Sequence, residues 1–217
     1  MTVQRGAIKV EVDLRGSCHP VRDQGDRPAC LACAVSDAHA MSHGSSPLSA
    51  EFLFFHAIRI AKFGNLVDGI LFEEAAGALK QNGQPAETEW PYNTTQPDPW
   101  IAPAVTTRWH GTLEHARTDP ITSIVELVKR GRPVALGIRL SSAFLAPLPD
   151  NNSIPGAGSS FGGHAVLVVG LGRDAANEQY FLIRNSWGQT WGERGYAWLA
   201  ADYLLDKHIG FGPVTAQ

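Results

Sequence analysis

The sequence contains little cysteine, no long apolar run and no cluster of basic residues. Its 3 cysteines are too few, and odd in number, for the disulfide framework of a small secreted protein. No apolar stretch approaches the ~18 residues that a membrane span needs, and the opening MTVQRGAIKVEVDLRG lacks the apolar core of a signal peptide. The net charge is -3 and no run of Lys and Arg is present, which argues against nucleic-acid binding. We therefore expect a cytoplasmic protein that binds neither nucleic acid nor membrane, with export by a non-classical route left open.

The sequence does contain enough apolar residues for a sizeable core. Hydrophobic residues make up 44% of the 217 residues and charged residues 18%, which excludes wholesale disorder. The 22 glycines and 14 prolines favour long ordered loops over a helical bundle. A chain of this length suits one domain of two subdomains.

Helical patterns precede strand patterns along the chain. The predicted helices cover residues 29–43, residues 46 to about 63, residues 71–81, and a short segment between Asp119-Pro120 and Gly131. Residues 84–118 are predicted to be irregular. The predicted strands cover residues 133–140, 164–171, 180–185 and 196–200. Helices followed by an antiparallel sheet indicate an α+β protein.

Three residues fit the requirements of nucleophilic catalysis. Cys30 opens an apolar helix, where free backbone N–H groups favour a thiolate. Among the 8 histidines, His164 stands at the head of an apolar strand, FGGHAVLVVG. Asn185 ends the next predicted strand in RNSWG and would lie beside His164 if the two strands pair. Cys, His and Asn together form a known variant of the catalytic triad.

Three blocks of sequence resemble the papain-like (C1) cysteine peptidases. They are VRDQGDRPACLACA, GGHAVLVVG and FLIRNSWGQTWGERGYAWL, and they occur in the family's order. His164 and Asn185 follow Cys30 by 134 and 155 residues, within the family's approximate spacing. LSAEFLFF and NGQPAETEWPY extend the likeness. The resemblance implies an α+β papain-like fold in one domain, residues 1–217. It has a helical subdomain of about residues 15–118, an antiparallel β-barrel-like subdomain of about 119–217, and a cleft between them. The N-terminal strand is expected to cross to the second subdomain.

The resemblance also implies a cysteine peptidase that acts on polypeptide and needs no cofactor or metal. Cys30 would be the nucleophile, held as a thiolate beside an imidazolium at His164. Gln24 and the backbone N–H of Cys30 would bind the oxyanion. Asn185 would orient His164, and Trp187 would shield their hydrogen bond from water.

Expected substrate contacts follow from the same resemblance. Gly69 and Ile70 stand where the family has a glycine pair that binds extended substrate. Ala165 and Gly137 align with the pocket for the side chain two positions before the cleaved bond, and Gly163 lies beside it. Because both pocket residues are small, with Ile70 as an apolar wall, we expect a large apolar substrate side chain there.

Departures from the family pattern keep other functions open. Arg27 replaces a cysteine that normally forms a disulfide, so we expect a fold without disulfides. Leu31 replaces the usual tryptophan, and only about a dozen residues precede VDLRG where a prodomain would stand. These traits resemble intracellular, prokaryote-type members. A thiol acyltransferase or amidase that processes a dedicated peptide is one alternative, and a catalytically silent binding module is another. A protein activator or inhibitor also remains open.

Other chemically suggestive residues have simpler interpretations. Cys33 completes a CxxC with Cys30 but lacks the βαβ context of a redox pair, so we expect a small buried hydrophobe. His39 and His43 lack the further ligands of a zinc site. Glu73 and Glu74 are expected on the solvated surface.

Overall fold

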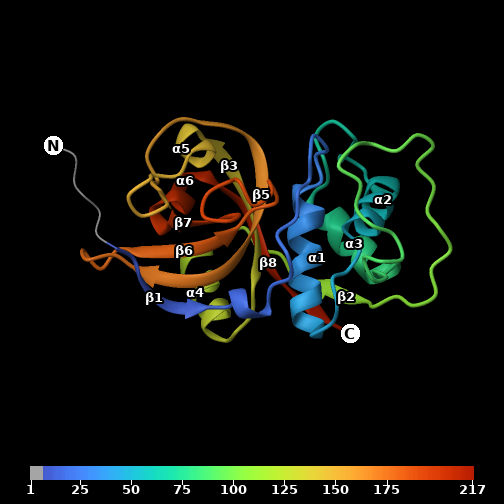
Figure 1. The fold of residues 1–217 in the computed structure, drawn as a ribbon, viewed down its shortest axis with the longest axis horizontal. Coiled ribbons are helices and arrows are strands. Elements are labelled where there is room, and N and C mark those ends of the chain that lie inside the picture. Colours follow the sequence, from blue (N-terminus) through green and yellow to red (C-terminus); the bar gives the residue numbers. More distant parts are fainter. Residues whose placement is uncertain (1–6) are drawn as a thin grey trace.

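Helices α1, α2 and α3 lie in one half of the molecule, and most of the sheet lies in the other half together with α4, α5 and α6 (Figure 1). The computed structural model describes residues 7–217. Its helices are α1 (Cys30–His43), α2 (Ala50–Ile60), α3 (Phe72–Gln81), α4 (Pro120–Lys129), α5 (Ser142–Leu145) and α6 (Leu204–Lys207), with 3-10 turns at Arg15–Ser17 and Ala201–Tyr203. Its strands are β1 (Lys9–Asp13), β2 (Gly111–Leu113), β3 (Val134–Ser141), β4 (Ser153–Ile154), β5 (Ser160–Arg173), β6 (Gln179–Arg184), β7 (Tyr196–Ala200) and β8 (His208–Ala216). Within residues 7–217, no helix is long and apolar enough to cross a membrane. The predicted α+β class is confirmed.

Helix α1 is the central helix that the sequence predicted. Every residue from Leu31 to Ala40 is buried. The segment is apolar on nearly all sides, as is typical of a helix that other parts of the protein surround. The helix ends at Gly44, which takes a left-handed conformation with φ 65°. Glycine adopts this conformation without the strain that a Cβ would add.

Helix α2 is shorter than predicted because a capping residue fixes its start. The sequence pattern placed the helix between Ser46 and about Phe63, but α2 covers Ala50–Ile60. The Ser49 side chain accepts a hydrogen bond from the Phe52 N–H at 3.0 Å, which is the usual role of a helix N-cap.

Glu74 corrects another expectation. Its exposed fraction is 6%, whereas we expected it on the solvated surface beside Glu73, which is indeed exposed. The Glu74 carboxylate accepts backbone N–H groups of Lys62, Phe63, Gly64 and Leu71 at 2.9–3.1 Å. A carboxylate with four donors is stable inside a protein. Glu74 therefore holds the loop of residues 61–70 onto the start of α3.

The strands form one open sheet in the order β2-β8-β3-β5-β6-β7-β4, with β1 paired to β5. The sheet does not close, so the expected barrel-like closure is wrong. Neighbouring strands are antiparallel except β4 and β7. The pairing of β1 with β5 confirms that the N-terminal strand crosses to the sheet half. The sequence pattern missed β8, since HIGFGPVTA lacks a clear alternation of apolar and polar residues.

Strand β5 is buried on both faces and separates two hydrophobic cores. Ala165, Leu167 and Val169 belong to the core that includes α1. Val166 and Val168, which point to the opposite face, belong to the core beneath α4. The continuous apolar run that predicted this strand therefore reflects contacts on each side of the sheet.

A buried carboxylate joins α1 to the sheet. Asp37 Oδ1 is 2.7 Å from Arg22 Nε, and its Oδ2 is 2.7 Å from Arg184 Nε at the end of β6. Burial alone would raise the pKa of Asp37, but the two guanidinium groups outweigh this effect and the pKa is lowered. The carboxylate therefore stays charged and holds α1 against β6.

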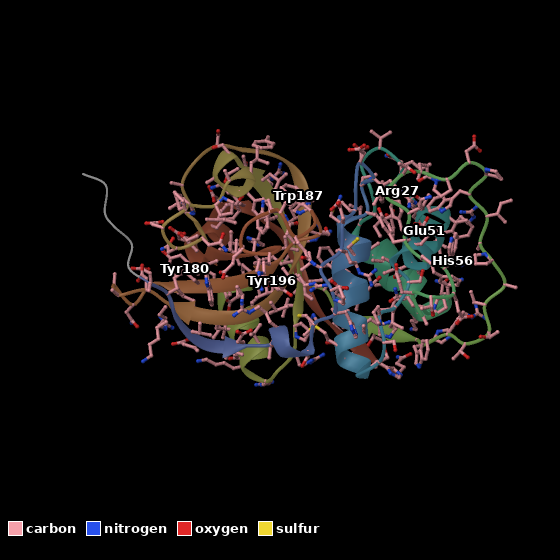
Figure 2. All side chains as sticks on the ribbon, viewed as in Figure 1. Arg27, Glu51, His56, Tyr180, Trp187 and Tyr196 are labelled. Carbon is pink, nitrogen blue, oxygen red and sulfur yellow. The ribbon has the colours of Figure 1, made fainter. Side chains whose placement is uncertain are left out.

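Arg27, which stands where the resemblance places a disulfide cysteine, forms a second buried ion pair. The Arg27 guanidinium binds both carboxylate oxygens of Glu51 in α2 (Figure 2), with Nη1–Oε2 at 2.5 Å and Nη2–Oε1 at 2.9 Å. The rings of Phe54, Tyr92 and Trp100 surround the guanidinium at 5.1–5.2 Å. All three cysteines are free thiols, which confirms the expectation of no disulfide.

Replacing Glu51 tests this ion pair. Glu51→Gln leaves the Arg27 charge buried without a counter-ion, so we expect the free energy of unfolding to fall by about 3–5 kcal/mol. Urea denaturation measures this change, and the exposed Glu178→Gln is the matched control with little effect. A reducing agent should not change either curve. A loss below ~1 kcal/mol for Glu51→Gln would contradict a structural role for the pair.

Candidate active site

His164 and Asn185 come together because β5 and β6 are neighbours in the sheet. His164 lies in β5, and Asn185 directly follows β6. The distance from His164 Nε2 to Asn185 Oδ1 is 2.7 Å. Asn185 Oδ1 also accepts the Ser186 N–H at 2.8 Å, which fixes the orientation of the amide. Neutral His164 must therefore carry its proton on Nε2, and the lone pair on Nδ1 can act as a base.

Aromatic rings enclose this hydrogen bond. The centroid of the Trp187 ring is 4.6 Å from that of His164, and the Phe144 ring lies at 5.5 Å. Phe144 also stacks on Trp191 at 5.1 Å. Trp187 lies beside the boundary between the sheet and α1 (Figure 2). Sequence reasoning missed Phe144, because its short helix α5 carries no motif.

Cys30 faces β5 from the first turn of α1. The backbone N–H of Ala165, the residue after His164, acts to lower the pKa of the Cys30 thiol and so favours a thiolate. The N–H of Leu31 acts in the same direction, as expected where a helix has unpaired donors. The residue is partly exposed, while Cys33 is buried one turn further along α1.

Burial opposes a charge on either reacting group by itself. It raises the pKa of the Cys30 thiol, although the N–H groups act against it. Burial also lowers the pKa of His164 to about 4, although the hydrogen bond to Asn185 acts against it. With these pKa directions, a thiolate at Cys30 and an imidazolium at His164 would form only as a pair, by transfer of the thiol proton.

Gln24 joins this group through Ser186, which sequence reasoning did not single out. Gln24 is buried, and its Oε1 accepts the Ser186 hydroxyl at 2.7 Å. Its Nε2 donates to the Arg27 carbonyl at 2.9 Å, which leaves the second amide hydrogen for another acceptor. Because Ser186 follows Asn185, one short segment positions both amide side chains. In the sequence, the only sign of a role for Ser186 was its position in the motif RNSWG.

A glycine is required at position 69, where the loop passes Pro28 just before the start of α1. A Cβ at this position would lie 2.5 Å from the Pro28 carbonyl oxygen, and the backbone has φ +89°. Only glycine accepts both conditions without strain. Ile70, by contrast, is buried in the helical core at 8% exposure. Its expected role as an apolar wall of the substrate pocket stays a prediction.

A ring from α3 lies next to part of the expected substrate pocket. Gly137 and Ala165 are partners in the β3–β5 pairing, and a Cβ on Gly137 would lie 3.0 Å from Phe72 Cε2 and 3.4 Å from Ile209 Cβ. Phe72 is 7% exposed. Its ring therefore narrows the space beside Gly137. Gly163 is exposed just before His164.

Comparisons with known proteins identify the family of the chain. The sequence profile described as papain family cysteine protease matches residues 8–210. The chain belongs to this family. A cathepsin L-like peptidase of Aedes aegypti is 29% identical over 94% of this chain and 61% of its own length. Cathepsin J of Mus musculus is 26% identical over 93% of this chain and 62% of its own length. The chain thus spans about three fifths of these papain-family relatives.

Solved structures of papain-like proteases share the fold. Xylellain, a cysteine protease from Xylella fastidiosa, superposes with a TM-score of 0.74 at 24% identity and covers 99% of this chain and 92% of its own. The bromelain protease from Ananas comosus, solved with the E64 inhibitor, has a TM-score of 0.69 at 21% identity, with 93% and 97% coverage.

The remaining histidines of this papain-family chain have structural partners. His39 is buried, and its ring nitrogens lie 2.9 Å from Gln84 Oε1 and 3.2 Å from the His110 carbonyl. Within residues 7–217, no three His, Cys, Asp or Glu side chains are grouped to hold a metal ion. Cys33 lies on α1, and its small side chain is buried in the core.

We expect Cys30 to be the most reactive of the three cysteines. It is partly exposed and has N–H donors, whereas Cys33 is buried and burial strongly raises its pKa. Burial also raises the pKa of Cys18. We expect iodoacetamide at neutral pH to label Cys30 first, as measured by peptide mapping over time. Cys33→Ala serves as the control and should leave the labelling rate of Cys30 unchanged. Earlier modification of Cys18 or Cys33 would contradict this assignment.

Proposed function

We propose that this chain is a cysteine peptidase that hydrolyses polypeptides, with Cys30 as nucleophile, His164 as base and Asn185 as the residue that orients it. The observation that carries the proposal is the 2.7 Å hydrogen bond from His164 Nε2 to Asn185 Oδ1. It directs the basic Nδ1 away from Asn185, while Cys30 faces the same strand at Ala165. Nucleophile, base and orienting group are the three parts that thiol catalysis requires.

The first half-reaction forms a thioester. Cys30 Sγ attacks the carbonyl carbon of the substrate, and the thiol proton passes to His164 Nδ1. His164 then gives this proton to the leaving nitrogen, the C–N bond breaks, and the amine product departs. Burial favours this transfer because it holds the pKa of His164 low, so that the imidazolium gives up its proton readily.

The second half-reaction returns the enzyme to its starting state. A water molecule attacks the thioester while His164 removes one of its protons. The C–S bond breaks, the acid product leaves, and the proton returns to Cys30. If an amine replaced water, the same thioester would yield a new amide. Acyl transfer, the alternative from the sequence, therefore differs from hydrolysis only in the acceptor.

The oxyanion formed in each step needs fixed donors. The backbone N–H of Cys30 lies in the first turn of α1, where helix N–H groups have no partner within the helix. The remaining amide hydrogen of Gln24 is the second candidate, since Ser186 and Arg27 hold the rest of its side chain. Two such donors stabilise a tetrahedral oxyanion.

Treatment of an unbiased peptide library, with the products identified by mass spectrometry, tests the proposed activity. Hydrolysed products that disappear with Cys30→Ala would support it, and products joined to an added amine would favour acyl transfer instead. No cleavage by the wild-type chain would refute it. The expected reducing, cytoplasmic location stays a proposal, and the three free cysteines are compatible with it.

Substitutions in the triad should have unequal effects. His164→Ala removes the base, so we expect kcat/KM to fall by about 10²–10⁴-fold. Asn185→Ala removes only the orienting hydrogen bond, and its loss should be smaller. In the wild type, kcat/KM should fall as the pH drops through about 4, where His164 becomes protonated. Initial rates across this pH range provide the measurement. An acid limit near the usual histidine value of 6.5, or equal losses for both variants, would contradict these roles.

Phe72 should restrict the substrate side chain two positions before the cleaved bond. We expect peptides with Ala there to be cleaved faster than peptides with Leu, because Phe72 fills the space beside Gly137. Phe72→Ala should improve the Leu-to-Ala ratio of kcat/KM by roughly 10–100-fold, the gain from burying a leucine. Phe55→Ala, which removes another buried ring from the helical half, should leave the ratio unchanged. A wild-type preference for Leu would contradict this role.

A further inference from the structure

Cys33 is a buried thiol that the proposed mechanism does not use. It follows Cys30 on α1, where the two form a CxxC motif, and its exposed fraction is 1%. Reagents in solution therefore have almost no direct access to its sulfur. Cys30 is partly exposed, so a small oxidant that enters the candidate active site meets this thiol first.

The two thiols lie on the same side of α1. Side chains three residues apart in a helix are neighbours, with Cβ atoms about 5–6 Å apart. Cys30 is close enough to Cys33 to act on it electrostatically, and both thiols act in the same way on Tyr92. The Tyr92 hydroxyl donates to the Gln24 carbonyl at 3.0 Å. Both sulfurs are therefore near the segment that carries Gln24.

A disulfide between these two residues requires only a small movement. Its Cβ atoms would have to lie about 3.5–4.5 Å apart, which is roughly 1 Å closer than in a regular helix. Cys30 is the first residue of α1, and Ala29 before it has a non-helical backbone with φ -102° and ψ 15°. Because helix ends adjust more easily than helix interiors, the first turn can close this gap while the later turns stay in place.

Cys18, the third cysteine, is too far from Cys30 to compete. The Cys18 sulfur lies 3.7 Å from the sulfur of Met41, which is three turns further along α1 than Cys30. At the helical rise of about 1.5 Å per residue, Met41 is roughly 16 Å from Cys30. The Cα atoms of a disulfide lie about 4.4–6.8 Å apart. Within one chain, only Cys33 can therefore reach Cys30.

We propose that Cys33 protects the reactive thiol of Cys30 by forming a reversible disulfide with it when a peroxide oxidises Cys30. The disulfide form has no free thiol to attack a substrate, so the pair is also a redox switch. The proposal goes beyond peptide hydrolysis, and it requires only that Cys30 is the accessible thiol.

The oxidation takes place in two balanced steps. In the first step the Cys30 sulfur attacks hydrogen peroxide, an S–O bond forms and the O–O bond breaks. The thiol proton leaves with the released oxygen as water, so that Cys30 is oxidised to a sulfenic acid and the peroxide is reduced. In the second step the Cys33 sulfur attacks the Cys30 sulfur, the S–O bond breaks, and the hydroxyl leaves as water with the proton of Cys33. A dithiol then reduces the disulfide and restores both thiols.

The burial of Cys33 suits this resolving role. Burial raises the pKa of its thiol, so Cys33 stays protonated and inert toward reagents in solution. The sulfenic acid of Cys30 is held beside it by the same helix, and the leaving hydroxyl takes up the proton. Without this neighbour, a second peroxide would oxidise Cys30 to the sulfinic acid, which dithiols do not reduce.

Mass spectrometry of the full chain tests the proposal. The protein is treated with a molar excess of hydrogen peroxide, and half of the sample is then reduced with dithiothreitol. Before reduction, the wild type should lose the mass of two hydrogen atoms, and peptide mapping should find Cys30 linked to Cys33. After reduction, the original mass and the labelling of Cys30 by iodoacetamide should return in full.

Removal of Cys33 should make the oxidation irreversible. In Cys33→Ala the same treatment should add two oxygen atoms to Cys30, and dithiothreitol should not restore its labelling. Cys33→Val leaves a smaller cavity and should behave like Cys33→Ala, which separates loss of the thiol from loss of packing. Cys18→Ala is the matched control and should form and release the disulfide as the wild type does. If neither Cys33 variant folds, the linkage mapped in the wild type decides.

Three results would overturn the proposal. They are a wild-type chain that gains oxygen without forming the Cys30–Cys33 linkage, a disulfide that contains Cys18 or joins two chains, and equal recovery of labelling by the wild type and Cys33→Ala. Mass and labelling are measured without a peptide substrate. A chain that forms the disulfide but cleaves no peptide would therefore refute the proposed peptidase function alone.

Discussion

The ion pairs of Asp37 are the interaction on which the site depends. Asp37 lies on α1 two turns after Cys30, and it binds Arg184, the residue before Asn185. One carboxylate therefore fixes the helix that carries the nucleophile against the strand that ends at the orienting amide. Arg22 supplies the second guanidinium, so the buried charge is compensated on both sides. Loss of one partner from a buried pair of this kind costs about 3–5 kcal/mol, and here it would also separate the two walls of the site.

The position of the site between two cores explains its electrostatics. His164 lies on β5, whose faces contact both hydrophobic clusters, and rings of Phe144 and Trp187 cover it. This exclusion of water disfavours an isolated charge on His164 or Cys30. It also strengthens each hydrogen bond and dipole directed at the reacting atoms. The same burial that lowers the pKa of His164 therefore makes the Asn185 and backbone contacts effective.

Several features were predictable from local sequence, and others were not. The apolar segments predicted α1 and β5, and the order of the motifs predicted that His164 and Asn185 meet. Glu74 shows the limit of such reasoning, because its four N–H donors, in the preceding loop and at Leu71, do not distinguish it in the sequence from a surface glutamate. Phe72 shows the same limit. Its ring lies beside Gly137 of β3 and Gly210 of β8, which are far from Phe72 along the chain. Ser186 had a visible motif, but its bond to Gln24 spans 162 residues.

The available chemistry was visible in the sequence: a cysteine at a helix start, a histidine in one strand, an asparagine just after the neighbouring strand, and the glycine that its loop requires. These depend on residue type, short-range pattern and family resemblance. Tertiary structure alone decided how much space surrounds those groups and how strongly water is excluded from them. It placed the ring of Phe72 beside Gly137 and buried the ion pair of Arg27 and Glu51. Shape and burial arise from the packing of segments far apart in the chain, and no local pattern of residues records that packing.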